Sequence, residues 1–521
     1  FNRTVSVYTT PEGKQYLVDV QLGYKSNVST RQVARLVIDT GSGDTVVFGE
    51  VHCDNRDNEF FNHELAGREC FVYQNSSSFK FNVQGLGRRV NSACTIEAEG
   101  HPGAYCREAL LIDGYKAEVG CELAWEDAQF ADLDGMPDQE MIRTDICVVN
   151  DTTSEGFKMR YWNNTQGTLG MFYHICAPGQ GEAKCETPYP ALLSTLPRSV
   201  GHTFTFDFNP PGIPSYMHFG VPEEGWKGMQ WSETQPIPLV GRTTAYSAPY
   251  AFHSFEIYDM SLCGANLLSN YSSHWTAMVD TGASCLSLPE EFFQMVTAWV
   301  PALECVSERV QGYDNTECKD SLCSEFNNLT ICYLAEGASA DDLPVLSFRL
   351  SEKGSELHLP LSGLIVNDRP SGRPRVCVNP ADSIAMFRRE EIKSFLFFPK
   401  ISFGTLALRN LHITFDMEAT TVGLRNKVTY DVSTNAGLCA EPVSCIGAQS
   451  PYPAKNLCID PPCEQVYFHV LDESRKTCRI SNGFLVSVII TLVAFALAEI
   501  ALSEIYDKLA HKLTSNYTAT G

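Results

Sequence analysis

Apolar and polar side chains alternate along much of this chain, which is the pattern of β-strands with one buried face. The runs at 15–22 and 203–208 show this alternation, and they are bounded by Pro, Gly and Asn, residues typical of turns. Patterns of amphipathic helices are few, with candidates at 289–300 and 381–393. This balance predicts an all-β protein with minor helices.

One segment near the end of the chain departs from this pattern. Residues 480–498 carry no charge and consist mainly of Val, Ile, Leu, Phe and Ala. At about 1.5 Å per residue, a helix of this length spans roughly 28 Å, which is enough to cross the hydrocarbon core of a bilayer. A buried core helix is the alternative, but the segment follows all the cysteines and leaves little sequence to pack against. We expect a transmembrane helix at 480–503 that binds the lipid bilayer, and a cytosolic tail at 504–521.

Length and charge narrow the class of protein. The chain has 521 residues, of which 44% are hydrophobic and 19% are charged, so we expect a folded protein with two or more domains. Its net charge of −23 argues against nucleic acid as a partner, because phosphate binding requires a basic surface.

Cysteines and glycosylation motifs indicate an oxidising compartment. The 20 cysteines are irregularly spaced, and their close pairs lack the spacing of a zinc site, so disulfides are favoured over a metal. Asn-x-Ser/Thr motifs, where we expect glycosylation, precede the apolar segment at Asn2, Asn27, Asn75, Asn150, Asn163, Asn270 and Asn328. We therefore expect a single-pass type I membrane protein of the secretory or endosomal system or the cell surface, with its large part outside the cytosol.

Two short stretches far apart in the chain are near-copies of each other. Residues 37–42 read Val-Ile-Asp-Thr-Gly-Ser, and residues 278–283 read Met-Val-Asp-Thr-Gly-Ala. A single D-T-G triplet is most often a turn in which the Asp caps a loop. Two copies, each after an apolar strand-like run, indicate instead that one carboxylate unit is used twice. The repeat also predicts two related lobes, with a connection near 209–214.

Paired carboxylates can supply both the acid and the base of a reaction. If the loops that contain Asp39 and Asp280 face each other, the two carboxylates cannot both be ionised, and they share one proton. The ionised member can take a proton from a bound water while the protonated member polarises a carbonyl. Cys285 lies close to Asp280 and could be taken for a nucleophile, but a structural disulfide is favoured there.

These motifs resemble those of the bilobal, pepsin-like aspartic proteases over residues 14–425. Further segments resemble the strands that cross behind the two catalytic loops, the closing strands of the second lobe, and the segment that leads to the flap. In that order they lie at 167–170 and 401–404, at 413–416 and 422–424, and at 73–79.

The resemblance implies a catalytic dyad of Asp39 and Asp280, with no metal and no cofactor. It also implies a supporting role for the loop residues Thr40, Gly41, Ser42, Thr281, Gly282 and Ala283, with Ser42 hydrogen-bonded to Asp39. Candidates for the flap are Leu111, Gly114 and Tyr115, although the usual flap Tyr of the family falls on Leu111. Ala283 stands where many members carry a hydroxyl that bonds the second carboxylate.

We therefore expect an N-terminal protease lobe at 1–205, a C-terminal protease lobe at 206–426 and a Cys-rich juxtamembrane stalk at 427–479. The expected function is an aspartic endopeptidase that hydrolyses peptide bonds of extended polypeptides with a water activated between the two aspartates. The departures from the family pattern leave one alternative open, a catalytically inactive pepsin-like glycoprotein that acts as a structural or binding component.

Overall fold

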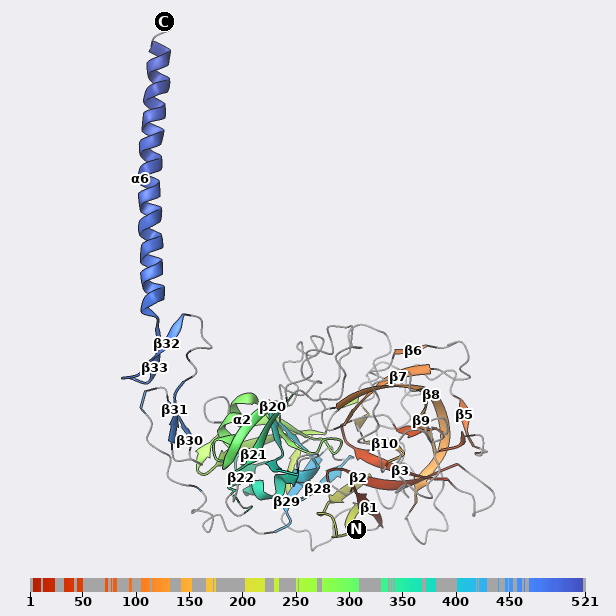
Figure 1. Cartoon of the computed structure of the whole chain (residues 1–521). Helices are drawn as coiled ribbons and strands as arrows, with labels where there is room; N and C mark the ends of the chain where they lie inside the picture. Colours follow the sequence, from red (N-terminus) through yellow and green to blue (C-terminus); the bar gives the residue numbers. More distant parts are fainter. Residues whose placement is uncertain are drawn as a thin grey trace. The chain divides into compact units, whose positions relative to one another are not determined.

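β-strands account for most of the regular structure, and helices are few (Figure 1). The predicted strands at 15–22 and 203–208 form β2 (Tyr16–Leu22) and β12 (Thr203–Asp207), and the helical pattern after the second D-T-G motif forms α2 (Glu290–Thr297). The prediction of a mostly β protein with minor helices is confirmed. The helical candidate at 381–393 lies outside the described residues. This computed structural model describes residues 3–10, 13–23, 32–41, 45–49, 71–73, 76, 78–81, 93–95, 105–112, 115–131, 142–151, 165–171, 173–174, 202–220, 229–233, 250–251, 253–268, 274–308, 329–335, 338, 340, 343–367, 372–380, 401–417, 419, 421–428, 439, 446–447, 449–452, 457–461, 463 and 468–518.

The chain forms two compact units, Phe1–Cys439 and Ala440–Gly521. Both predicted protease lobes fall in the first unit, and the boundary between them remains a prediction. The start of the predicted stalk also belongs to the first unit, where a disulfide joins Cys439 to Cys263.

A 15-stranded sheet runs through the first unit in the order β14–β29–β28–β12–β13–β1–β2–β3–β10–β4–β9–β8–β7–β6, with β5 paired to β8. Strands from the beginning and from the end of the unit therefore share one sheet, because β12 pairs with both β13 and β28. Besides β2 and β12, the strands are β1 (Arg3–Thr9), β3 (Gln32–Asp39), β4 (Val46–Phe48), β5 (Lys80–Phe81), β6 (Ala93–Thr95), β7 (Tyr105–Ile112), β8 (Tyr115–Phe130), β9 (Ile142–Asp151), β10 (Gly167–Gly170), β13 (Ser215–Phe219), β14 (Gln230–Glu233), β28 (Leu411–Asp416) and β29 (Thr421–Asn426).

Smaller sheets complete the first unit. An 8-stranded sheet has the order β23–β22–β16–β18–β27–β19–β26, with β17 paired to β16, and a 4-stranded sheet has the order β20–β21–β25–β24, while β11 pairs with β15. Their strands are β11 (Tyr173–His174), β15 (Tyr250–Ala251), β16 (Ser254–Leu262), β17 (Ala265–Asn266), β18 (His274–Val279), β19 (Leu286–Leu288), β20 (Ala302–Glu308), β21 (Leu329–Leu334), β22 (Val345–Arg349), β23 (Leu357–Pro360), β24 (Ile365–Asn367), β25 (Pro374–Val376), β26 (Val378–Pro380) and β27 (Ile401–Phe403). Two short helices, η9 (Leu361–Leu364) and α5 (Thr405–Leu408), follow β23 and β27.

Aromatic side chains fill the interior where early and late strands meet. The ring of Phe204 on β12 lies 4.8 Å from that of Phe415 on β28, and the ring of Phe206 lies 4.7 Å from that of Phe208. Tyr16 on β2 stacks on Phe208 at 4.0 Å. All five are buried, and burying a side chain of this kind contributes about 1.5–3 kcal/mol, so these rings hold β2, β12 and β28 together.

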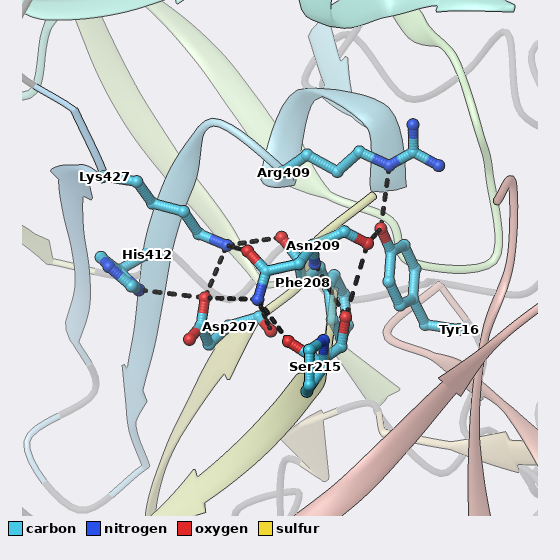
Figure 2. Close-up of polar contacts among 9 residues, drawn as sticks. Tyr16, Asp207, Phe208, Asn209, Ser215, Arg409, His412 and Lys427 are labelled. Atoms are coloured by element: carbon cyan, nitrogen blue, oxygen red, sulfur yellow. Dashed lines mark hydrogen bonds and ion pairs between the residues drawn. The ribbon is translucent and has the colours of Figure 1, made fainter. Parts of the chain in front are cut away.

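A cluster of polar side chains lies beside these rings (Figure 2). Lys427, just after β29, has its Nζ 2.6 Å from Asp207 Oδ1. The same ammonium donates to the carbonyl of Phe208 at 2.5 Å and to the side-chain oxygen of Asn209 at 3.1 Å. Burial lowers the pKa of Lys427, and the Asp207 carboxylate opposes this shift. The ion pair therefore ties the end of β29 to the end of β12.

The same cluster continues to β2 through Arg409 (Figure 2). Arg409 Nε donates to the hydroxyl of Tyr16 at 2.9 Å, and that hydroxyl donates to the carbonyl of Asn209 at 2.8 Å. His412 Nδ1 lies 3.7 Å from Asp207 Oδ1. Burial lowers the pKa of His412 to about 3 although Asp207 favours its protonation, so the imidazole is neutral near pH 7. Because His412 is neutral, the charged partner of Asp207 in this cluster is Lys427.

In the described part of the second unit, the chain forms two hairpins and the long apolar helix (Figure 1). β30 (Ser450–Tyr452) pairs with β31 (Leu457–Ile459), and β32 (His469–Asp472) pairs with β33 (Thr477–Ile480). The helix, α6, covers Asn482–Thr518. A disulfide joins Cys463 to Cys478 on β33, which ties the second hairpin to the segment before it.

α6 begins where Ser481 accepts a hydrogen bond from the N–H of Phe484 on its Oγ at 3.2 Å, an N-terminal cap. Asn482–Leu509 is long and apolar enough to cross a membrane. Its apolar side chains are exposed, with Phe495 at 68%, so this helix is not a buried core helix. The prediction of one C-terminal apolar helix is confirmed, and the helix continues into the segment predicted as a tail.

Removing the cation of the polar cluster tests its contribution to stability. Lys427→Met keeps the apolar stem but leaves Asp207 without its ammonium partner, so we expect the free energy of unfolding to fall by about 2 kcal/mol. Arg349→Met is the matched control, because the Arg349–Asp259 pair, at 3.3 Å, is exposed and should be worth less than about 1 kcal/mol. Chemical denaturation of the full chain in detergent measures both, and equal losses would contradict the prediction.

Candidate functional site

Asp39 is the last residue of β3, a strand paired on both sides. β3 is antiparallel to β2 and parallel to β10, where Gly170 lies opposite Asp39. The N–H of Met171, just after β10, donates to the carbonyl of Asp39 at 2.8 Å. Val37 and Ile38 are fully buried, so the apolar half of the first motif anchors the strand and fixes where its aspartate leaves the sheet.

Asp280 follows β18 in the same way. β18 is antiparallel to β16 and parallel to β27, where Phe403 lies opposite Val279. The N–H of Asp280 donates to the carbonyl of Phe403 at 3.1 Å, and Met278 and Val279 are buried. Both aspartates therefore leave a strand that lies between one antiparallel and one parallel neighbour. The two copies of the motif share one local structure.

Two threonines join the two loops directly. Thr40 Oγ1 donates to the carbonyl of Val279 and accepts from the N–H of Thr281, both at 3.0 Å. Thr281 Oγ1 in turn donates to the carbonyl of Ile38 at 2.8 Å and accepts from the N–H of Thr40 at 2.9 Å. Both threonines are fully buried. This set of four hydrogen bonds, the Thr40–Thr281 contact, is reciprocal and fixes the spacing of the loops.

The carboxylates of Asp39 and Asp280 meet around the two motif glycines. The N–H of Gly41 donates to Asp39 Oδ1 at 2.7 Å, and the N–H of Gly282 donates to Asp280 Oδ1 at 3.0 Å. Each glycine also lies against the opposite aspartate. A Cβ atom on Gly41 would lie 2.5 Å from Asp280 Oδ1 and 3.0 Å from Asp39 Oδ1, and one on Gly282 would lie 2.5 Å from Asp39 Oδ1. Only glycine fits at these two positions, because the carboxylates occupy the space of a side chain.

Backbone donors and partial exposure define what this pair can do chemically. Asp280 Oδ1 accepts a second hydrogen bond, from the N–H of Ala283 at 3.2 Å. Asp39 is buried, whereas Asp280 is partly exposed. Two carboxylates held against the same two glycines repel each other when both are ionised. A carboxyl and a carboxylate placed side by side are groups that can serve as a general acid and a general base.

The segments predicted to lie behind the loops form β10 and β27. Each is parallel to the strand that carries an aspartate. Thr168 and Ser402 occupy equivalent positions in them, and their hydroxyls are buried without a hydrogen-bond partner among the described residues. The structure does not explain why these two positions are polar.

Two of the predicted flap residues lie in the hairpin of β7 and β8. Leu111 pairs with Lys116 across this hairpin, and Tyr115 begins β8. Gly114 and Ser42 lie outside the described residues. The flap role of this hairpin therefore remains a prediction.

One predicted glycosylation site, Asn150, lies in the described part of the chain, where it belongs to β9. The remaining six lie outside it: Asn2, Asn27, Asn75, Asn163, Asn270 and Asn328. Glycosylation therefore stays a prediction for all seven.

A disulfide holds Cys285, close to the second aspartate loop, as predicted. Cys285 is bonded to Cys377, with Cα atoms 4.7 Å apart, so it is a structural cysteine and not a nucleophile. Cys121 is bonded to Cys147 in the same unit. The oxidised pairs favour a compartment outside the cytosol.

Two supports of the loops cannot be found from the sequence. The backbone carbonyl of Lys14 accepts hydrogen bonds from Thr405 Oγ1 at 2.5 Å and from Ser284 Oγ at 3.2 Å, which ties the N-terminal segment to the second loop. The other is His253, whose ring contacts the segment after β10. A backbone carbonyl leaves no sequence signal, and His253 belongs to no motif.

No protein-family model matches the chain, and no curated protein matches it significantly.

Removing one hydroxyl tests the Thr40–Thr281 contact. Thr40→Val keeps the side-chain shape but leaves the Val279 carbonyl and the Thr281 N–H without this partner in a buried site. We expect the free energy of unfolding to fall by about 2–3 kcal/mol, measured by chemical denaturation. Thr297→Val is the control, because Thr297 Oγ1 only bonds back to carbonyls of its own helix, and we expect a change within about 0.5 kcal/mol. A loss at Thr40 no larger than that at Thr297 would contradict the prediction.

Proposed function

We propose that this protein is an aspartic endopeptidase with a bilobal, pepsin-like fold, and that Asp39 and Asp280 form its catalytic dyad. The Thr40–Thr281 contact carries the proposal, because it holds two carboxylates against the same pair of glycines. Aspartates that merely cap turns have no need of a partner loop. Two carboxylates repel each other, so holding them together costs free energy. An arrangement that keeps them together in spite of this cost supports a catalytic role for the pair.

In the proposed mechanism the dyad holds one proton. The ionised carboxylate takes a proton from a water bound between the two, and the protonated carboxyl donates a hydrogen bond to the oxygen of the scissile carbonyl. The water oxygen attacks the carbonyl carbon and forms a tetrahedral intermediate. Proton transfer to the amide nitrogen then releases the amine, and the C–N bond breaks. The N–H groups of Gly41, Gly282 and Ala283 keep the carboxylates oriented throughout.

The repeated local structure supports the pepsin-like assignment. Each aspartate ends a strand with one antiparallel and one parallel neighbour, and each parallel neighbour, β10 or β27, is the segment that resembles the family pattern. A duplicated lobe would produce this equivalence, since each lobe would contribute one loop and one carboxylate.

The proposed substrate is an extended polypeptide. β7 and β8 form a long antiparallel hairpin, and β8 alone has 16 residues. In the proposed fold the tip of this hairpin, near Leu111 and Tyr115, is the flap over the dyad. Strand edges bind extended peptides through backbone hydrogen bonds, so this hairpin would favour unfolded or extended segments as substrates.

The proposed location is the membrane of the secretory or endosomal system or the cell surface, with type I topology. α6 can cross a bilayer, and the disulfides favour an oxidising compartment for the large part of the chain. Glycosylation of the seven Asn-x-Ser/Thr motifs would demonstrate this orientation, because glycans are added on the side away from the cytosol.

Loss of either carboxylate should abolish hydrolysis. We expect the full chain to cleave a denatured protein between pH 3 and pH 7, and Asp39→Asn and Asp280→Asn each to lower kcat on the order of 10⁴-fold. Asp259→Asn is the matched control, because Asp259 is exposed and its positive φ of 49° suits Asn equally well. Release of labelled peptides measures the rate. No cleavage by the wild type across this range, together with no binding of a statine-containing transition-state analogue, would favour the inactive scaffold instead.

Charges in the middle of α6 should remove the membrane anchor. We expect the full chain to stay in the membrane pellet after alkaline carbonate extraction, and Leu492→Arg combined with Phe495→Arg to release it, since each Arg costs about 2.5–3.5 kcal/mol at the centre of a span. Ser474→Arg adds a charge outside the helix and is the control. Extraction of the wild-type chain by carbonate would refute the anchor.

A further inference from the structure

An exposed aromatic side chain lies where the second hairpin meets α6 (Figure 1). The ring of Phe468, just before β32, stacks on that of Phe484 in the first turn of α6, with centroids 4.1 Å apart. The carbonyl of Phe468 accepts from the N–H of Ser481 at 2.7 Å. Phe468 is nevertheless 59% exposed. The hairpin is therefore fixed to the start of the helix, with much of an apolar ring left exposed.

The backbone of Phe468 has an unfavourable conformation. Its φ of 66° lies in the left-handed region, which bulky side chains rarely adopt. This conformation costs free energy, and the Ser481 hydrogen bond and the contact with Phe484 offset the cost. Strained residues of this kind cluster at functional positions, so the placement of this ring calls for a reason.

A second apolar side chain is exposed at the same end of the hairpin. Ile480, the last residue of β33, lies opposite His469 and is 44% exposed. Phe468 directly precedes His469, and we call Phe468 and Ile480 the apolar end of the hairpin. At the other end, the turn at 473–476 consists of Glu, Ser, Arg and Lys. The hairpin is therefore apolar where it meets α6 and polar at its turn.

The charge-free part of α6 is short for a bilayer. The charged residues that bound it are Arg479, before the helix, and Glu499, within the helix. Residues 482–498 rise roughly 25 Å, at about 1.5 Å per residue. The hydrocarbon core of a bilayer is about 30 Å thick, so about 5 Å of apolar surface is missing from this part of the helix.

The apolar end of the hairpin can supply the missing surface. Phe468 contacts the first turn of α6, so its ring lies at the level where the surface is needed. Ile480 ends β33 just before the helix begins. Moving these exposed side chains into the edge of the hydrocarbon removes apolar area from water, which is favourable. The charges of Arg479 and Glu499 then stay outside the core, where they remain hydrated.

We propose that Phe468 and Ile480 insert into the edge of the bilayer beside α6, where they contact lipid acyl chains and complete the span at its N-terminal end. Lipid is favoured over a protein partner because the two side chains continue the apolar surface of α6, and because two side chains are too few for a stable protein interface. The inference rests on the proposed membrane anchor and not on the proposed hydrolysis.

Photo-crosslinking of the full chain tests this contact. The photoreactive p-benzoylphenylalanine replaces Phe468, Arg475 or Phe495, one at a time, and each protein is reconstituted into phosphatidylcholine nanodiscs. Phe468 and Phe495 are matched, because the reagent only adds a benzoyl group to an existing phenyl ring. Arg475 is exposed in the turn of the same hairpin, about 13 Å from its apolar end along the strands. Mass spectrometry after irradiation measures the yield of lipid adducts.

The yields at the three positions decide the inference. We expect the yield of lipid adducts at position 468 to reach about half of that at 495 or more, and the yield at 475 to stay below about one-tenth of it. With adducts at 495, a yield at 468 as low as that at 475 would overturn the inference and leave the anchor in place. A crosslink from 468 to protein, in the same chain or in a second copy, would overturn it too. If position 495 forms no adduct, the proposed anchor itself fails, and the inference falls with it.

Glu499→Leu tests the length argument separately. The charge-free part of α6 then extends to residue 503 and rises roughly 33 Å, enough to span the core without the hairpin. We expect the adduct yield at 468, relative to that at 495, to fall about threefold or more. Glu504→Leu is the matched control, because it removes the same charge but keeps Glu499, and its yield should stay within about 1.5-fold of the wild type. An unchanged yield at 468 in Glu499→Leu would overturn the inference.

Discussion

Holding two carboxylates next to each other is the constraint on which the rest of this molecule depends. Each would be more stable in water, and their charges repel when both are ionised. The loops of Asp39 and Asp280 oppose this cost with the reciprocal Thr40–Thr281 contact and with backbone N–H groups aimed at the carboxylates. Since both threonines are fully buried, no water can replace a hydrogen bond that is broken there.

The sheets act as the frame for these loops. Parallel neighbours β10 and β27 fix the point at which each aspartate leaves its strand. Strands from both ends of the first unit share the 15-stranded sheet. A shift of β28 would therefore displace β12 and disturb the packing of Phe204 against Phe415. The ion pair of Asp207 and Lys427 joins the end of β12 to the end of β29 (Figure 2). Rigid support of this kind is what an acid–base pair with a fixed separation requires.

Burial has opposite consequences at different polar groups of the first unit. At Lys427 an adjacent carboxylate compensates for burial, and the charge is kept. At His253 only a carbonyl is at hand, and the ring stays neutral. This difference leaves a neutral ring at His253 and a charged ammonium at Lys427.

The sequence by itself determined the strand-rich character, the single apolar helix and the two aspartate motifs, because these depend on neighbours in the chain and on simple periodicity. It also predicted that Cys285 is structural. Only the tertiary structure decided that Thr40 contacts Thr281, that Lys14 supports the second loop and that the ring of His253 bonds the Met171 carbonyl just after β10. Such contacts link residues far apart in the chain, and they follow from strand order and register, which local patterns of polarity do not specify.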